Sequence, residues 1–107
     1  MNSLSSHVLD TALGKPAAGM KLRLTTSEGQ VIEGVTDNDG RCNVWADAHF
    51  SPGTYHLHFS TGKYLKTKHG KAFYPYVDIT FEMEYEGGHY HVPLLISPFG
   101  FSSYRGS

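Results

Sequence analysis

Apolar and polar residues alternate along several stretches of this chain, and this alternation is its strongest structural signal. In residues 77–85 every odd position is apolar and every even position is polar. Residues 54–60 alternate in the same way. Because successive side chains of a strand point to opposite faces, both stretches predict half-buried antiparallel strands. Two further strands are expected at 20–26 and 31–36, around a hairpin turn at 27–30.

Shorter apolar runs predict strands near both ends of the chain. Val8 and Leu9 indicate a short first strand that ends at the turn formers of 14–16. Residues 92–96 are typical of a buried strand, in which Pro93 favours a sheet edge or a bulge. Clusters of turn-forming residues separate the strands, at 37–40, 51–53 and 86–88. This spacing predicts an all-β sandwich of short strands, forming a single domain over residues 1–107.

Residues 61–69 are the one stretch with a helical pattern. Thr61 is placed to cap the first turn, and Gly70 to end the helix. The lysines between 63 and 71 are interpreted as the solvated face of this helix.

Composition and charge narrow the function classes. The 107 residues carry a formal net charge of -1 without a basic stripe, which argues against a nucleic-acid partner. The single cysteine, Cys42, excludes an internal disulfide and favours a reducing compartment. The sequence has no signal-peptide pattern and no apolar run of about 20 residues. We therefore expect a cytoplasmic protein with no membrane partner.

Residues suited to a reaction site are expected at the ends of separate strands: His7, Arg41, His91 and Tyr104. A histidine can take a proton from water near neutral pH, and an arginine can hold a planar anion or a developing oxyanion. Sites rimmed by loops are commonly built in this way. The ordinary alternatives stay open, because strand-surface histidines are usually just solvated, and Arg41 can neutralise the acidic turn before it.

Two His-x-His pairs need separate consideration, His56 with His58 and His89 with His91. Alternate strand positions place both imidazoles of a pair on one face, a geometry that can bind zinc or copper. Neither pair has a cysteine or carboxylate at an obvious ligand spacing, so we expect no physiological metal.

The chain ends on a phenol, a guanidinium and a carboxylate, within Tyr104-Arg105-Gly106-Ser107. Such a tail is either a short polar end or part of a site. Three segments resemble motifs of a known family and so favour a site: 6–17 (SHVLDTALGKPA), 36–41 (TDNDGR) and 89–107 (HYHVPLLISPFGFSSYRGS). In order, they resemble the opening motif, the central turn and the C-terminal signature of the transthyretin-like 5-hydroxyisourate hydrolases. The terminal YRGS separates these enzymes from the hormone-carrying transthyretins. Ser103 is a conservative departure, since the family more often has threonine there.

The resemblance covers the whole chain and implies a transthyretin-like β-sandwich of two four-stranded sheets with one short helix. It also implies a homotetramer, a dimer of dimers, with active sites at the dimer–dimer interface. The family reaction hydrolyses 5-hydroxyisourate to 2-oxo-4-hydroxy-4-carboxy-5-ureidoimidazoline during urate degradation, with no cofactor or metal.

Carried over by position, the family's site falls on His7, Arg41, His91 and Tyr104, with Arg105 and Ser107 completing the terminal motif. The two histidines are expected to share the base and acid work, in an order left open. Arg41 is expected to bind the substrate and polarise its carbonyl. Tyr104 is expected to orient the substrate or its water, and the Ser107 carboxylate to fix Arg105 or a neighbouring subunit. His89 is expected at the rim.

Two other functions remain as alternatives. The same tetramer channel serves a small-molecule carrier of the thyroid-hormone-binding kind, which requires small and apolar residues where this chain has histidines and a tyrosine. A generic adhesion or accessory β-sandwich is the third, and the lack of a signal peptide argues against it.

Overall fold

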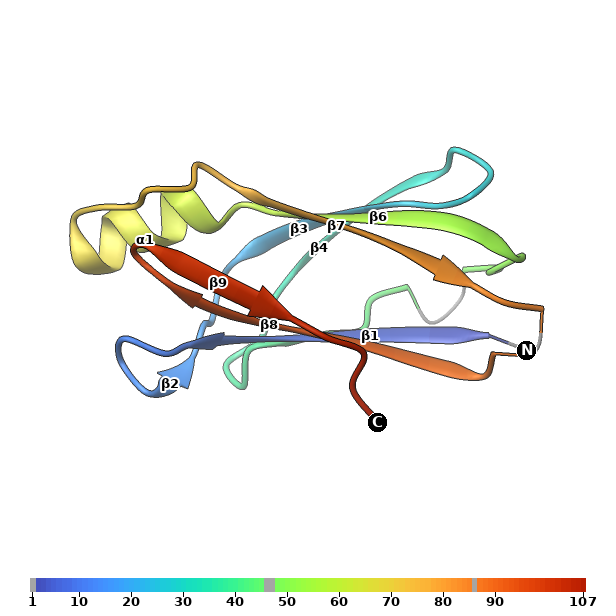
Figure 1. Ribbon diagram of the computed structural model, residues 1–107, viewed down its shortest axis with the longest axis horizontal. Helices are drawn as coiled ribbons and strands as arrows, with labels where there is room; N and C mark the ends of the chain where they lie inside the picture. Colours follow the sequence, from blue (N-terminus) through green and yellow to red (C-terminus); the bar gives the residue numbers. More distant parts are fainter. Residues whose placement is uncertain (1, 46–47, 86) are drawn as a thin grey trace.

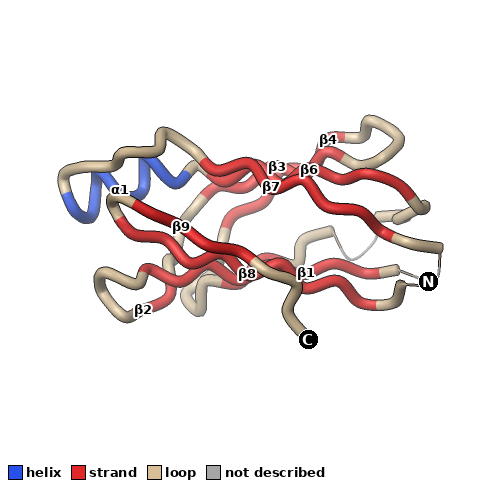
Figure 2. Tube along the Cα trace, in the orientation of Figure 1, coloured by secondary structure: helices blue, strands red, loops and turns tan. Residues whose placement is uncertain are grey.

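The computed structural model describes residues 2–45, 48–85 and 87–107, which form two β-sheets packed face to face with a short helix at one end (Figure 1, Figure 2). The elements are β1 (Ser3–Asp10), β2 (Lys15–Pro16), β3 (Lys21–Thr25), β4 (Val31–Val35), β5 (Arg41–Cys42), β6 (Gly53–Phe59), α1 (Thr61–His69), β7 (Val77–Met83), β8 (His89–Ser97) and β9 (Gly100–Ser103). The predicted sandwich of two sheets with one short helix is confirmed for these residues.

Each sheet is built on a path of four strands. The first sheet runs β2-β1-β8-β9, with the two-residue β5 also pairing with β1, and the second runs β4-β3-β6-β7. The first sheet contains one parallel pair, β1 with β8, which stays in register from Ser3 opposite His89 to Asp10 opposite Ile96. Figure 1 shows these two strands side by side in the lower layer. This parallel pair positions the site.

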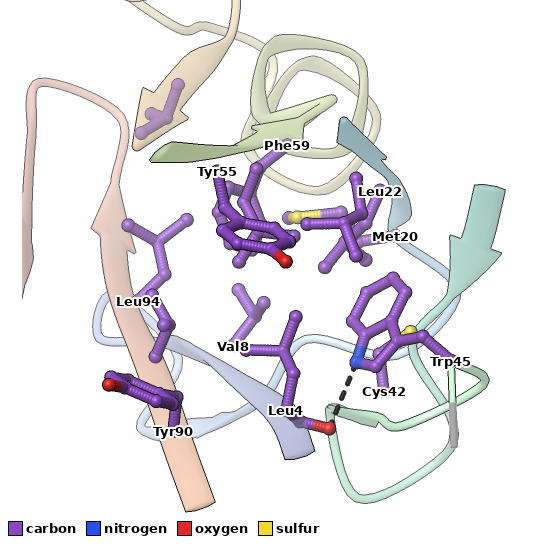
Figure 3. Close-up of a cluster of buried hydrophobic side chains, with 14 of the residues drawn as sticks. Leu4, Val8, Met20, Leu22, Cys42, Trp45, Tyr55, Phe59, Tyr90 and Leu94 are labelled. Atoms are coloured by element: carbon purple, nitrogen blue, oxygen red, sulfur yellow. Dashed lines mark hydrogen bonds between the residues drawn. The ribbon is translucent and has the colours of Figure 1, made fainter. Parts of the chain in front are cut away.

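The core lies between the sheets, where the alternating apolar residues meet. Tyr55 and Phe59 of β6 face Val8 of β1 across the interior, and all three are fully buried (Figure 3). Trp45 closes one side of the core and donates its indole N–H to the Leu4 carbonyl at 3.1 Å. Burying each of these large side chains contributes roughly 1.5–3 kcal/mol. The strands predicted from alternation, β3, β4, β6 and β7, are confirmed within two residues at their ends.

The first strand is longer than predicted, because its N-terminal half is rich in polar residues and has no clear apolar pattern. It begins at Ser3, so His7 lies in its middle rather than at its start. Ser6 occupies a buried position, where its hydroxyl donates to the Val92 carbonyl at 2.7 Å. A satisfied hydroxyl is tolerated in the core, but it removes the apolar signal that would reveal the strand. The turn formers at 15–16 also form a strand, β2, paired antiparallel with β1.

The prediction of a sheet edge or bulge at Pro93 was wrong, because β8 is a central strand between β1 and β9. The ladder with β9 stops at the pair Leu94–Ser103, and the chain returns to β8 only at the isolated bridge of His91 with Gly106. Pro93 lies in this gap, where its missing N–H costs no ladder hydrogen bond. The Pro93 carbonyl accepts from the Ser103 hydroxyl at 2.8 Å instead.

The helix occupies the predicted residues, but its N-cap is Ser60 and not the predicted Thr61. Ser60 holds the N-cap position without a side-chain hydrogen bond, and Thr61 lies inside the helix with its buried hydroxyl unpartnered among the described residues. Gly70 ends the helix as predicted, in a left-handed conformation with φ of 77° and its N–H bonded to the Lys66 carbonyl. No helix in the described part of the chain is long and apolar enough to cross a membrane.

Candidate active site

The outer face of the first sheet brings together three of the predicted site residues. In β1 the odd positions face outward, and in β8 the outward positions are His89, His91 and their alternates. The antiparallel pairing of β5 with β1 sets Arg41 opposite His7, while the parallel pairing sets His91 opposite Ser5. The expectation that these residues lie at strand ends was wrong for His7 and His91, which lie within their strands, whereas Arg41 begins β5. The three residues lie on the face of a sheet and not on a rim of loops.

His7 is held in one tautomer by the turn that precedes Arg41. Its Nε2 lies 2.9 Å from the backbone carbonyl of Asp39, which can only accept, so Nε2 carries a hydrogen. In the neutral ring Nδ1 is then the atom with a free lone pair. The turn needs glycine at position 40, where φ is 74° and a Cβ would lie 2.4 Å from the Val8 carbonyl oxygen.

Arg41 does not neutralise the acidic turn. The carboxylate of Asp37 accepts backbone N–H groups of Asp39 and Arg41 at 2.9 and 3.0 Å, which stabilises the turn itself. The Arg41 side chain is exposed, and no salt bridge to it is found among the described residues. Its guanidinium is therefore available to a bound anion.

His91 is the most perturbed histidine of this face. It is half-buried, and burial is the main cause that lowers its pKa below the ordinary value of 6.5. The positive charge of Arg41 and the neighbouring His7 and His89 lower the pKa further, and a backbone hydrogen bond with Ser5 opposes them in part. His91 is therefore neutral at neutral pH, which is the form that accepts a proton.

The C-terminal tail packs directly against His91. The Gly106 N–H donates to the His91 carbonyl at 2.8 Å. A Cβ at Gly106 would lie 2.5 Å from Cδ2 of the imidazole, so only glycine allows this approach. Arg105 lies over the Tyr90 ring, 4.2 Å from its centroid, and donates to the carbonyls of Gly87 and His89 at 3.1 and 3.4 Å. The tail is thus bound to β8 by several independent contacts.

Tyr104 is placed apart from the two histidines and Arg41. It follows the last strand rather than lying on it, is 61% exposed, and lines a cavity of about 400 Å³ at the edge between the sheets. Phe81, Tyr90 and Arg105 also line this cavity, but His7, Arg41 and His91 do not. Ser107 is exposed, and the contacts of Arg105 within the chain are with carbonyls and Tyr90.

Sequence reasoning missed Ser3 and Ser5, which connect the histidines of β8. Ser5 Oγ lies 2.8 Å from His91 Nδ1 and 2.9 Å from His89 Nε2, and Ser3 Oγ lies 2.6 Å from His89 Nδ1. The available signal was the shared alternation of Ser3, Ser5 and His7 with His89 and His91. It becomes informative only once β1 and β8 are known to be parallel.

The other His-x-His pair makes separate cross-strand contacts on the second sheet. His56 bonds to the Thr80 hydroxyl at 3.0 Å and His58 to the Asp78 carboxylate at 2.7 Å. In the described ranges no group of three or more His, Cys, Asp or Glu side chains is placed to hold a metal ion. Cys42 is buried, and burial raises the pKa of its thiol, which favours an unreactive state.

The chain matches the HIUase/Transthyretin family over residues 4–106. It is 42% identical over 111 residues to the 5-hydroxyisourate hydrolase of Mus musculus, covering 97% of this chain and 94% of that protein. Among solved structures, the 5-hydroxyisourate hydrolase of Klebsiella pneumoniae is similar with a TM-score of 0.87 and 35% identity, over 100% of this chain and 94% of that one.

A second solved structure is similar over only part of its own length. (S)-allantoin synthase has a TM-score of 0.87 and 35% identity over 99% of this chain, but this chain covers 44% of that protein. The family match, by contrast, extends over nearly all of the present sequence and includes both strands that carry the histidines. From its sequence, its sandwich of two sheets and this match, the chain belongs to the HIUase/Transthyretin family.

Proposed function

We propose that this protein hydrolyses 5-hydroxyisourate, the reaction named in its relatives from mouse and Klebsiella. The observation that carries the proposal is the shared outer face of β5, β1 and β8, where Arg41 lies opposite His7 on β1 and His91 lies on the next strand, β8. The substrate is a planar, carbonyl-rich ring, which matches a guanidinium that has no other partner in the described chain.

The proposed mechanism opens the ring by adding water to a carbonyl carbon. His91 accepts the proton of the attacking water at Nε2, because Nδ1 is bonded to Ser5 and the lowered pKa keeps the ring neutral. Arg41 stabilises the oxyanion that develops on the attacked carbonyl. The proton that His91 accepted passes to Nδ1 of His7, which delivers it to the departing nitrogen as the adjacent C–N bond breaks. The carboxylic acid formed in this step releases its remaining proton to solvent and leaves a carboxylate. No cofactor or metal takes part in these steps.

The open position of this site supports association between copies of the chain. A flat outer face gives a substrate little shelter from water, and a second surface would cover it. The end strands β7 and β9 lie at the same side, lining one edge cavity, and this edge exposes Phe101 and Tyr104. We therefore propose a homotetramer, a dimer of dimers, in which Tyr104, Arg105 and Ser107 contribute to substrate binding. Light scattering coupled to size exclusion tests this, and a monomer with full activity would contradict it.

The carrier alternative fits this face less well. A carrier of apolar aromatic ligands requires small or apolar side chains, whereas the face presents two imidazoles and a guanidinium. Tight binding of a thyroxine-like ligand without any turnover would reverse this preference.

The proposed activity is tested by following the ultraviolet absorbance of 5-hydroxyisourate, generated in place from urate by urate oxidase. The decay of this species is expected to accelerate in proportion to the concentration of the protein. Decay at the spontaneous rate, in the presence of folded protein, would contradict the proposed function.

A further inference from the structure

The outer face of the first sheet carries a continuous chain of four hydrogen-bonded side chains. Ser3 bonds to His89 Nδ1 at 2.6 Å, His89 Nε2 bonds to Ser5 at 2.9 Å, and Ser5 bonds to His91 Nδ1 at 2.8 Å. The parallel register creates it, because Ser3 is opposite His89 and Ser5 is opposite His91. Its outer end at Ser3 and His89 is exposed, and its inner end at His91 is half-buried.

Counting protons leaves two arrangements in which the Ser5 hydroxyl donates along the link between the rings. The Ser5 hydroxyl has one proton and can donate to only one of its two imidazole partners. If it donates to His89 Nε2, then His91 must donate from Nδ1, and His91 Nε2 keeps a lone pair. If it donates to His91 Nδ1, then the neutral His91 ring carries its hydrogen on Nε2 and cannot accept a proton there.

We propose that His89 is a positioning residue, which accepts the Ser5 proton and thereby holds His91 in the tautomer with a free lone pair at Nε2. The catalytic consequence rests on the proposed hydrolase function, in which His91 Nε2 is the base. The tautomer itself does not depend on that function. The role differs from the expectation from sequence, which placed His89 at the rim of the site.

The groups around His91 favour this arrangement. Arg41 of β5 carries a positive charge near the ring. Because Nδ1 is engaged by Ser5, Nε2 is the ring nitrogen left open, and a nearby cation favours a lone pair there over an N–H. On the tail, Gly106 packs on the ring edge, and Arg105 binds the His89 carbonyl rather than its imidazole. The outer nitrogen of His89 is bonded to the Ser3 hydroxyl, so both its nitrogens are engaged.

The tautomer is measured by nitrogen-15 NMR of the imidazoles in the intact protein, without substrate, at a pH where His91 is neutral. In the unmodified protein we expect the hydrogen on Nδ1 of His91. In His89→Leu, Ser5 loses its other acceptor and donates to His91, so the hydrogen should move to Nε2. His89→Gln retains an amide oxygen that can accept from Ser5, and it should keep the original tautomer. His56→Leu, on the second sheet, should leave the His91 signals unchanged.

Kinetics supply the second readout. His89→Leu and Ser5→Ala should lower kcat about ten- to a hundredfold, by analogy with the loss seen when a hydrogen-bonding partner of a metal-ligating histidine is removed. KM should stay within about twofold, because neither side chain is assigned to bind the substrate, and Ser5→Thr and His89→Gln should recover most of kcat.

A hydrogen on Nε2 of His91 in the unmodified protein, or an unchanged tautomer in folded His89→Leu, would overturn the positioning role. An absence of 5-hydroxyisourate turnover in the unmodified protein would contradict the proposed function, while the NMR result would still decide the tautomer.

Discussion

Asp10 is the residue that joins the first sheet to the helix. Its fully buried carboxylate accepts from the Tyr64 hydroxyl at 3.0 Å and bonds His69 Nε2 at 2.8 Å, so both turns of α1 are tied to β1. The same carboxylate accepts the backbone N–H groups of Ala12 and Leu13. Burial, and to a smaller extent this carboxylate, raise the pKa of Tyr64 to about 12. A buried charge is tolerated here because every lone pair that faces the protein is used.

Replacing Asp10 by alanine should destabilise the fold by about 3 kcal/mol, because several buried donors lose their acceptor. The chain offers a matched control in Asp78→Ala, which removes an exposed Asp–His pair and should change stability by no more than about 0.5 kcal/mol. Urea denaturation of both variants measures this difference. Equal losses would contradict the role assigned to burial.

Asp10 also makes stability depend on pH. Burial raises its pKa, but the hydrogen bonds from His69, Leu13 and Tyr64 together outweigh burial and leave the pKa below 3.8. The unfolded chain therefore binds a proton at this carboxyl before the folded chain does. Its contribution is complete above the unfolded pKa and should be lost as the pH falls through the folded value. Acid titration of the unfolding free energy should show this loss in the native protein and not in Asp10→Ala.

Arg41 acts on His91 through its charge. Because the guanidinium lowers the pKa of His91, Arg41→Gln should raise that pKa, although burial will keep it below the ordinary value. The acidic limb of the pH–rate profile should move to higher pH in the same direction, since the base is then protonated earlier. A pH titration of the His91 ring by NMR measures the shift. Arg23→Gln, on the second sheet, should leave the His91 titration unchanged.

At the scale of elements, the tail and β8 form one functional unit through Gly106. Gly106→Ala should displace the His91 ring or the tail by several tenths of an ångström, because the new Cβ would overlap the imidazole. Displacing a proton acceptor in this way should lower kcat about tenfold or more. Gly100→Ala is the control, since its Cβ would have only one contact, 3.8 Å from the Ser97 hydroxyl. Full activity in Gly106→Ala would separate the tail from the site.

Elements with a local signal were predictable, and those that depend on distant pairing were not. Alternation located β6 and β7 because inside and outside residues differ clearly along them. Neither β2 nor β5 has a pattern of its own, because each is two residues long and exists only through its pairing with β1. From sequence alone, Lys15 and Pro16 are expected in a loop, because nothing local indicates their pairing with β1.

The sequence allowed the residues of the candidate site to be named, but not their arrangement on a sheet face. His7, Arg41 and His91 were identified from residue chemistry and family resemblance, and the structure brings them to one face. Their connection through Ser5 arises from two strands that are 86 residues apart in sequence and parallel, an arrangement without a local signal. Thr61 failed as a cap because the preceding Ser60 already holds that position, so local propensity was displaced by one residue.

At the scale of the whole molecule, the sandwich exposes its proposed site on a sheet face and its terminal tyrosine at a sheet edge. Tyr104 lines the cavity at that edge, whereas His7, Arg41 and His91 do not line it. Association of copies would supply the missing wall and exclude water, which strengthens the charge interactions of Arg41. The near-neutral net charge of -1 places little repulsion in the way of such association.

The central claim is that the outer face of β1, β5 and β8 carries out hydrolysis, and a matched pair of histidine variants tests it most directly. His91→Ala and His56→Ala each remove one strand-surface imidazole, from the first and the second sheet respectively. In the 5-hydroxyisourate decay assay, folded His91→Ala should lose at least about a hundredfold in kcat/KM, and His56→Ala should stay within about twofold of the unmodified protein. Near-normal turnover in His91→Ala, or an equal loss in both variants, would contradict the account.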